Sequence, residues 1–220
     1  MKKLCVAAGL FALAASVSVP SRAQDLRAVS INGIWNPVVG TGGAYHIKNS
    51  NGRESDMEFA VVGKESTGGA EGYWIEMTMA DPHGQGEIVV KSLLLFSNSN
   101  TLVHKTIVQM PGRPPMEMSD IMAAHAPGGS HFQDVHVDAQ NVGSESVTVP
   151  AGTFTCDHWH GKDGDAWIAK DISPYGLVKA SSKEGMLMVL TKVIKDAKDK
   201  ITGTPQPFNP MMMRQQAPPQ

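Results

Sequence analysis

Apolar and polar residues alternate along most of the chain from about Tyr45 onward, and this period of two is typical of β-strands with one buried face. Short polar or glycine-containing segments separate the alternating runs, so we expect successive antiparallel strands joined by tight turns. Asn51-Gly52 and Asp163-Gly164 are the strongest hairpin signals. The predicted strands cover residues 45–48, 57–62, 72–79, 88–96, 102–110, 135–139, 146–149, 154–160, 166–170, 177–181 and 186–193.

The alternation breaks in the middle of the chain. Residues 111–115, with the sequence Pro-Gly-Arg-Pro-Pro, predict a stiff loop. Residues 119–125 then predict a short helix with Ser119 as its N-cap, and Pro127 and the two glycines after it end this helix. A short helix at this place could lie over one face of the predicted sheet.

Several predicted strands are apolar on both faces for part of their length. In residues 88–96, Val89 and Leu93 lie on one face, and Val90 and Leu94 lie on the other. A sheet with one solvated face alternates more cleanly, so the second face is covered by a helix, a second sheet or a bound apolar ligand. We therefore expect a mainly β (α+β) fold, built as a curved antiparallel sheet or incomplete barrel with a short helical lid.

The two ends of the chain differ from this β-rich region. Residues 1–23 have the features of a secretory signal peptide: Lys2 and Lys3, then an apolar run too short for a stable membrane span, then Ser21-Arg22-Ala23. We expect a single β-rich domain over residues 24–203. Residues 204–220 are rich in Pro, Met and Gln and predict a disordered tail. The mature protein is thus expected in the periplasm or secreted, with no stable membrane span after signal cleavage.

Charge narrows the classes of partner. The chain has 19 Lys and Arg against 21 Asp and Glu, and loss of the leader with Lys2, Lys3 and Arg22 leaves 16 against 21, a net charge of −5. A surface of this sign does not favour nucleic acid. Cys156 is left as the single cysteine of the mature chain, so no intrachain disulfide can form and stability depends on the core.

Methionine supplies the first candidate site. Tyr73, Ile75, Met77 and Met79 share one face of their predicted strand, and Met186 and Met188 share a face of the last one. Unbranched thioethers adapt to ligands of varied shape, so these residues could line an apolar binding face. Met122, in the predicted helix, would lie over that face. The alternative is that the methionines fill an ordinary core.

A metal site is a second candidate. Cys156, His158 and His160 alternate on one strand, but Cys156 and His160 lie about 13 Å apart, beyond the reach of one ion. Only a neighbouring pair, best His158 with His160, could chelate a metal such as zinc or copper. The remaining ligands would come from His104, His131 or His136. The alternative places Cys156 in the core beside Phe154, with His160 at an exposed strand end.

Three Met-x-Met pairs extend the metal hypothesis. Thioether sulfur selects Cu(I), which makes a copper-handling protein a rival interpretation. The pairs in predicted strands are explained equally well by core packing, whereas Met116 and Met118 lie in a predicted loop. The three pairs are Met77/Met79, Met116/Met118 and Met186/Met188.

Enzyme signatures are missing from the sequence. It contains no G-x-S-x-G elbow, no H-E-x-x-H helix, no phosphate-binding G-x-x-x-x-G-K-[ST] loop and no C-x-x-C-H haem motif. We therefore expect a protein that is not an enzyme and needs no cofactor.

The last third of the chain carries a family resemblance. Residues 149–156 (Val-Pro-Ala-Gly-Thr-Phe-Thr-Cys), 164–167 (Gly-Asp-Ala-Trp) and 174–179 (Pro-Tyr-Gly-Leu-Val-Lys) resemble segments of exported bacterial proteins of unknown function. Those proteins are similar to the periplasmic lipoprotein carriers with a LolA-like half-barrel. The resemblance implies a half-open antiparallel barrel with a helical lid and an apolar cavity that binds acyl chains without transforming them. It carries over no catalytic residue.

These observations favour an exported, non-enzymatic protein that holds an apolar ligand, an acyl chain or lipid, on the concave face of a curved sheet. The expected partner is an apolar small molecule, a lipid or a lipoprotein. Two alternatives stay open: a periplasmic copper or zinc protein that uses the methionine pairs or His158 and His160, and a cell-envelope interaction module with a filled core and no small ligand.

Overall fold

The computed structural model describes residues 35–82, 84–97, 100–118, 131–132 and 139–208. The signal peptide predicted at residues 1–23, the helix predicted at 119–125 with Met122, and most of the strand predicted at 135–139 lie outside these residues. So does the predicted tail beyond residue 208.

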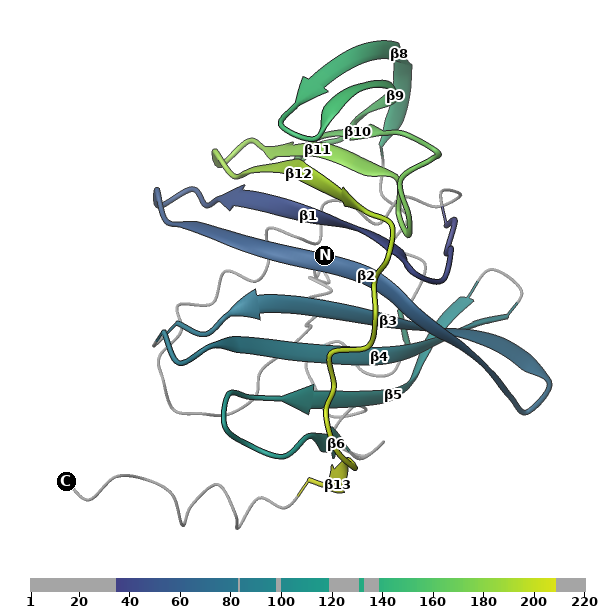
Figure 1. Ribbon diagram of the computed structural model, residues 1–220. Coiled ribbons are helices and arrows are strands. Elements are labelled where there is room, and N and C mark those ends of the chain that lie inside the picture. Colours follow the sequence, from purple (N-terminus) through teal and green to yellow (C-terminus); the bar gives the residue numbers. More distant parts are fainter. Residues whose placement is uncertain (1–34, 83, 98–99, 119–130, 133–138, 209–220) are drawn as a thin grey trace, which may run out of the picture.

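All regular structure in the described residues is β-structure. Strands β1 to β5 largely follow the predicted alternating runs, and β9 to β12 do so in the second half of the chain, whereas β8 begins six residues before its predicted run (Figure 1). The strands are β1 (Thr41–Lys48), β2 (Glu54–Thr67), β3 (Ala70–Ala80), β4 (Glu87–Ser97), β5 (Asn100–Gln109), β6 (Met116–Met118), β7 (His131–Phe132), β8 (Gln140–Val149), β9 (Gly152–His160), β10 (Gly164–Ile168), β11 (Leu177–Ser182), β12 (Leu187–Ile194) and β13 (Gln206–Pro207).

The strands form one open sheet in the order β13-β6-β5-β4-β3-β2-β1-β12-β11-β10-β9-β8, with β7 paired to β5. Each half of the chain is a meander of antiparallel neighbours, and the pairing of β1 with β12 joins the halves (Figure 1). The short β13 is paired in parallel with β6. The prediction of a mainly β, antiparallel fold is confirmed. No helix is present among the described residues, and therefore none there that could cross a membrane.

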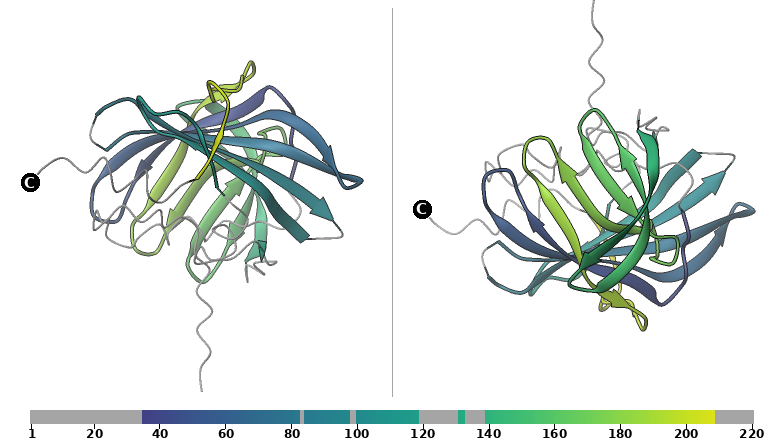
Figure 2. Two further views of the ribbon diagram at one scale, coloured as in Figure 1. Left: turned by 90° about the horizontal axis from the view of Figure 1, so that it is seen from below. Right: turned by 90° about the horizontal axis from the view of Figure 1, so that it is seen from above.

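The sheet curls strongly, so that strands β8 to β12 run at a wide angle to strands β2 to β5 (Figure 2). Three strands separate β8 from β12 in the sheet order, yet β8 contacts both β12 and β11. The backbone N–H of Ala151, at the tip of the β8–β9 hairpin, donates to the Leu190 carbonyl of β12 at 3.2 Å. Val147 and Val149 of β8 are thereby buried in one cluster with Tyr45 of β1. This cluster lies on the concave side of the sheet.

The opposite, convex side of β2 to β5 is covered by the chain itself. After β12, residues 195–205 run across these strands to β13, as the yellow segment in Figure 1 shows. Buried residues of this side include Val89 and Leu93 of β4 and Ile107 of β5. Over this half of the sheet, the second face is thus covered by an irregular segment of the same chain, and not by the helix, second sheet or apolar ligand expected from the sequence.

Candidate functional site

Strand register gathers methionines on the concave side. Because directly opposed residues of antiparallel strands point to the same face, partners can be followed from strand to strand. One row of opposed residues consists of Met116, Val108, Val90, Met77 and Phe59. The neighbouring row consists of Ile88, Met79, Met57, Tyr45 and Leu190. We call the concave surface formed by these two rows the methionine face.

The methionine face is apolar but unevenly buried. Met57 is only 5% exposed and belongs to the main core cluster, whereas Phe59, Met77 and Met79 pack against that cluster and remain partly exposed. Predicted residues Met77 and Met79 therefore offer thioether surface beside a rigid core. Sequence alternation placed them on one face, but their alignment with Met57 depends on register.

An aromatic group extends this surface beyond Ile75. Tyr73, which belongs to the predicted ligand set, makes an edge contact with Trp35 at a ring distance of 6.1 Å. The Trp35 ring also contacts Tyr175 at 5.2 Å, and Tyr175 in turn contacts Phe59 at 6.5 Å. Tyr175 keeps 42% of its surface exposed. The concave surface is thus continuous from methionine to aromatic side chains.

The other predicted ligand residues take different positions. Ile75 is buried in a smaller cluster with Val61. Met186 and Met188 are both 2% exposed and lie in the main core cluster, so they pack beneath the methionine face and offer almost no surface to a ligand. Met116 and Met118 lie on β6 and are partly buried. Met122 lies outside the described residues.

The pair on β6 is separated from the pair on β3. Two strands, β4 and β5, lie between them, so Met77 and Met116 are about 14 Å apart at the usual spacing of neighbouring strands. Both pairs share the concave side, but one metal ion cannot bind both. Any soft-metal site would use one pair with its immediate neighbours.

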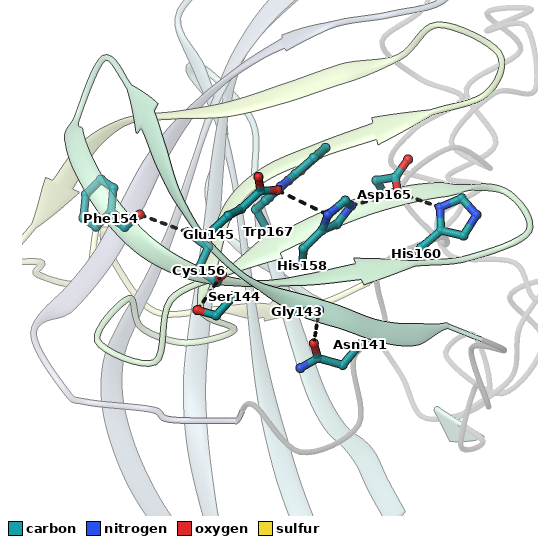
Figure 3. A network of polar contacts seen from close by, with 10 residues as sticks. All are labelled: Asn141, Gly143, Ser144, Glu145, Phe154, Cys156, His158, His160, Asp165 and Trp167. Atoms are coloured by element: carbon teal, nitrogen blue, oxygen red, sulfur yellow. Dashed lines mark hydrogen bonds and ion pairs between the residues drawn. The ribbon is translucent and has the colours of Figure 1, made fainter.

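A polar network occupies the other end of the sheet, on β8, β9 and β10 (Figure 3). His158 Nε2 lies 3.0 Å and His160 Nδ1 lies 2.7 Å from the same oxygen, Oδ1 of Asp165. The second ring nitrogen of His158 lies 3.2 Å from Oε1 of Glu145, which also accepts a hydrogen bond from the indole of Trp167 at 2.5 Å. The network therefore links three strands through side chains.

The cross-strand register explains this convergence. Asp165 is directly opposite His160, and Trp167 is directly opposite His158. The rings of His158 and Trp167 stack at 4.6 Å, and Lys179 Nζ of β11 lies 4.3 Å from the Trp167 ring centroid. These contacts tie neighbouring strands together, so the arrangement stiffens this edge of the sheet.

The electrostatics of Asp165 follow from its partners. Its partial burial favours the neutral acid, but hydrogen bonds and positive charge from His160 and His158 outweigh this and hold the pKa of Asp165 below its ordinary value. The carboxylate is therefore ionised at neutral pH and holds both rings in place.

The two predicted histidines contact Asp165 from the same strand, so the structure brings them together around a carboxylate. Cys156 is fully buried in the core, its Sγ 3.8 Å from the Phe154 carbonyl, and burial raises the pKa of its thiol to about 11. The residues that the structure describes include no group of three or more His, Cys, Asp or Glu side chains that could hold a metal. Metal binding by His158 and His160 stays a prediction.

Sequence reasoning missed the acidic partners of these histidines. Asp165 directly follows the hairpin signal Asp163-Gly164, which indicates only a turn, and Glu145 lies in a polar stretch that was not predicted as strand. The hairpin signal at Asp163-Gly164 would place Lys162 opposite Asp165, but the turn of the structure is centred on Lys162 and Asp163, Gly164 belongs to β10, and Asp165 lies opposite His160. No comparable signal existed for Glu145, because β8 contains an irregularity next to Gly143.

Comparison with known proteins gives two solved structures of low sequence identity. A candidate lipoprotein from Parabacteroides distasonis matches at 14% identity, covering 73% of this chain and 97% of that chain, with a TM-score of 0.38. A candidate exported protein with a YmcC-like fold from Bacteroides fragilis also matches at 14% identity, with coverage of 73% and 98% and a TM-score of 0.40. Neither is named as a lipoprotein carrier. No protein-family model matches the chain, and no curated protein sequence does.

Proposed function

We propose that this protein is an exported, non-enzymatic binding protein that holds an apolar ligand, an acyl chain or lipid, against the methionine face. The observation that carries the proposal is the register of β1 to β6, which aligns apolar side chains in two rows and leaves Met77 and Met79 partly exposed. We place the protein in the periplasm or outside the cell because of its leader-like N-terminus.

The chemistry of the surface agrees with an apolar ligand. Burial of an acyl chain contributes about 0.8 kcal/mol for each CH₂ group removed from water. Thioethers and aromatic rings meet such a chain without strict shape requirements, so the surface would discriminate weakly among chains of similar length. No charged residue belongs to the two rows of the methionine face.

The direct test is binding of a fluorescent fatty acid to the purified full chain and to the variant Met77→Glu. A carboxylate on the methionine face must be desolvated when the chain binds, so we expect at least about tenfold weaker binding, or about 1.4 kcal/mol. Leu187→Glu is the matched control, because Leu187 is exposed and lies on the opposite side of β12 from Met188. Equal affinity in all three proteins would refute the proposal.

A second candidate function, Cu(I) binding, rests on the pairing of Met57 with Met79. Met57 lies directly opposite Met79, and Met77 lies two residues away from Met79 on the same face. Opposed side chains have Cβ atoms about 5 Å apart, so their thioethers could share one Cu(I) ion. The test is Cu(I) titration in competition with a chromogenic chelator, using Met79→Leu to remove one sulfur at nearly constant volume. Met186→Leu, in the core, is the control.

A further inference from the structure

The segment that covers the convex side of the sheet is held there by hydrogen bonds and by charged groups. We call residues 195–205 the strap. Its first contact is the Ala197 N–H, which donates to the Gly40 carbonyl at 2.8 Å. Near its end, Thr202 exchanges two hydrogen bonds with the side chain of Gln109 on β5, each of 2.8 Å. Between these two points the strap passes over a buried acid.

That acid is Glu76 of β3, which is 2% exposed. Its Oε2 accepts a hydrogen bond of 3.0 Å from the backbone N–H of Lys200, which brings the carboxyl group of Asp199, the preceding residue, beside that of Glu76. Two carboxyl groups can share a hydrogen bond only when one of them carries a proton. The contact between strap and sheet therefore contains a buried titratable acid beside a second acid.

Acidic groups outnumber basic groups around this contact. Lys91, directly opposite Glu76 on β4, pairs with Asp199 and lies 4.7 Å from the Trp74 ring. Lys200 Nζ lies 2.8 Å from Glu58 of β2 and 3.4 Å from Glu87 of β4. In this part of the described structure, two ammonium groups face four carboxyl groups. The four carboxyl groups are those of Glu58, Glu76, Glu87 and Asp199.

We propose that the strap is a pH-sensitive clasp, docked on the convex side of the sheet while Glu76 and Asp199 share a proton and loosened when Glu76 loses it. Ionisation of Glu76 places a second negative charge beside Asp199 in a buried position where Lys91 and Lys200 already have partners. Loosening uncovers β2 to β4 and frees β13 from β6. This inference goes beyond the proposed ligand function and does not depend on it.

The direction of the pH effect follows from the two acids. Burial raises the pKa of Glu76 to about 7; the Lys200 N–H opposes this, and the charge of Asp199 adds to it. The favourable contribution of Glu76 is therefore present below its ordinary pKa and is lost as pH rises through about 7. For Asp199, burial is outweighed by the hydrogen bond from Lys91, and its pKa is lowered. The clasp is thus closed in mildly acidic solution and opens toward alkaline pH.

The experiment is hydrogen exchange of the strap amides in the full chain, resolved by NMR at about pH 5.5 and about pH 8.5 and corrected for the intrinsic effect of pH. The Lys200 and Thr202 amides donate to Glu76 and Gln109 and are the reporters. We expect the opening equilibrium of these amides to increase at least about tenfold at the higher pH, with amides of β9 as an internal reference.

Two variants separate the clasp from general effects of pH. Glu76→Gln keeps the shape of the side chain and removes its titration, so the strap amides should exchange equally at both pH values. Glu87→Gln removes an exposed acid that pairs with Lys200 Nζ and should leave the pH response in place. A wild-type protein with pH-independent strap exchange, or a Glu76→Gln protein that keeps the response, would overturn the proposal. Should Glu76→Gln fail to fold, the ¹³C shift of the Glu76 carboxyl in wild type decides: it must titrate near neutral pH.

Discussion

One carboxylate oxygen of Asp165 contacts two imidazole rings, and this residue therefore fixes the side-chain arrangement of the network on β8 to β10. His158 and His160 are positioned by it on the same strand. Both rings are held by hydrogen bonds, and that of His158 also stacks on Trp167, so their orientation does not require a bound ion.

Removal of Asp165 should destabilise the fold in a pH-dependent way. Asp165→Ala breaks two hydrogen bonds with His158 and His160, and we expect the free energy of unfolding at pH 7 to fall by about 1–2 kcal/mol. Because the pKa of Asp165 is lowered in the fold, its contribution is present above its ordinary value and is lost as pH falls through the lowered one. Urea unfolding at neutral and acidic pH measures this difference.

The exposed Asp163 supplies the matched control, since it lies in the same hairpin and neither histidine contact involves its side chain. Asp163→Ala should change the free energy of unfolding little at any pH. If Asp165→Ala destabilises the protein by the same amount at neutral and at strongly acidic pH, the ionic character assigned to this contact is wrong.

Individual residues were predictable where one strand decides their environment. The core position of Cys156 beside Phe154 was one of two alternatives drawn from alternation, and the structure shows it. The contacts of Glu145 were not predictable, because its two partners lie on other strands. Alternation assigns a side chain to a face, whereas register decides what it meets there.

At the scale of elements, β1 is longer than its sequence pattern indicates because two glycines were not recognised as part of a strand. Gly42 lies opposite Ala60, and a Cβ added to it would lie 2.1 Å from the Phe59 carbonyl oxygen of β2. No side chain fits between these backbones. The close approach of β1 to β2 thus depends on a residue type that normally weakens a strand.

Gly42→Ala should therefore disrupt the pairing of β1. The clash is with backbone atoms that cannot rotate away, so we expect a loss of unfolding free energy of about 2 kcal/mol or more. Gly63→Ala is the control, because a Cβ at this position would meet no atom closer than a Trp74 side-chain carbon at 3.4 Å. Thermal unfolding of both variants compares them, and a Gly42→Ala protein as stable as Gly63→Ala would contradict the account.

The hydrophobic pattern also failed to indicate the boundaries of β6 and β8. The structure places Met116–Met118 in a strand, β6, although the proline-rich context indicates a loop. β8 extends from Gln140 to Val149, but its first seven residues are exposed and mostly polar and carry no alternation. β8 is an edge strand that pairs on one side only and has an exposed first part, and β6 has only three residues, so no hydrophobic pattern reveals either strand.

On the scale of the whole molecule, the curl of the sheet creates the concave surface. It depends on the β8–β9 hairpin folding back onto β12, with Val147 and Val149 buried in the main cluster together with Leu190. A flat sheet would leave these valines and the methionine face exposed to water.

Loss of these two side chains should open the curl. The double variant Val147→Ala and Val149→Ala removes buried methyl groups and should lower the free energy of unfolding by about 2–4 kcal/mol. Ser146→Ala, at an exposed position of the same strand, is the control. Small-angle X-ray scattering should show a larger radius of gyration for the double variant only; equal stability of both variants would argue against this role of the hairpin.

The class of the fold was predictable from the sequence, but the way in which the two halves of the sheet join was not. Alternating runs indicated a mainly β, antiparallel fold, and tight turns indicated meanders. The pairing of β1 with β12 joins residues almost 150 positions apart and has no local signal. The strap likewise consists mostly of polar residues whose partners become visible only when the convex side is assembled.

Methyl NMR of the full chain can show whether an apolar ligand lies against the methionine face. Protein labelled with [methyl-¹³C]methionine would be titrated with oleate, after assignment of each signal by Met→Leu substitution. We expect the methyl signals of Met77 and Met79 to shift saturably, while that of Met186, 2% exposed in the core, changes little. Unchanged Met77 and Met79 signals at saturating oleate would show that the methionine face does not bind the ligand and would favour an interaction module with a filled core.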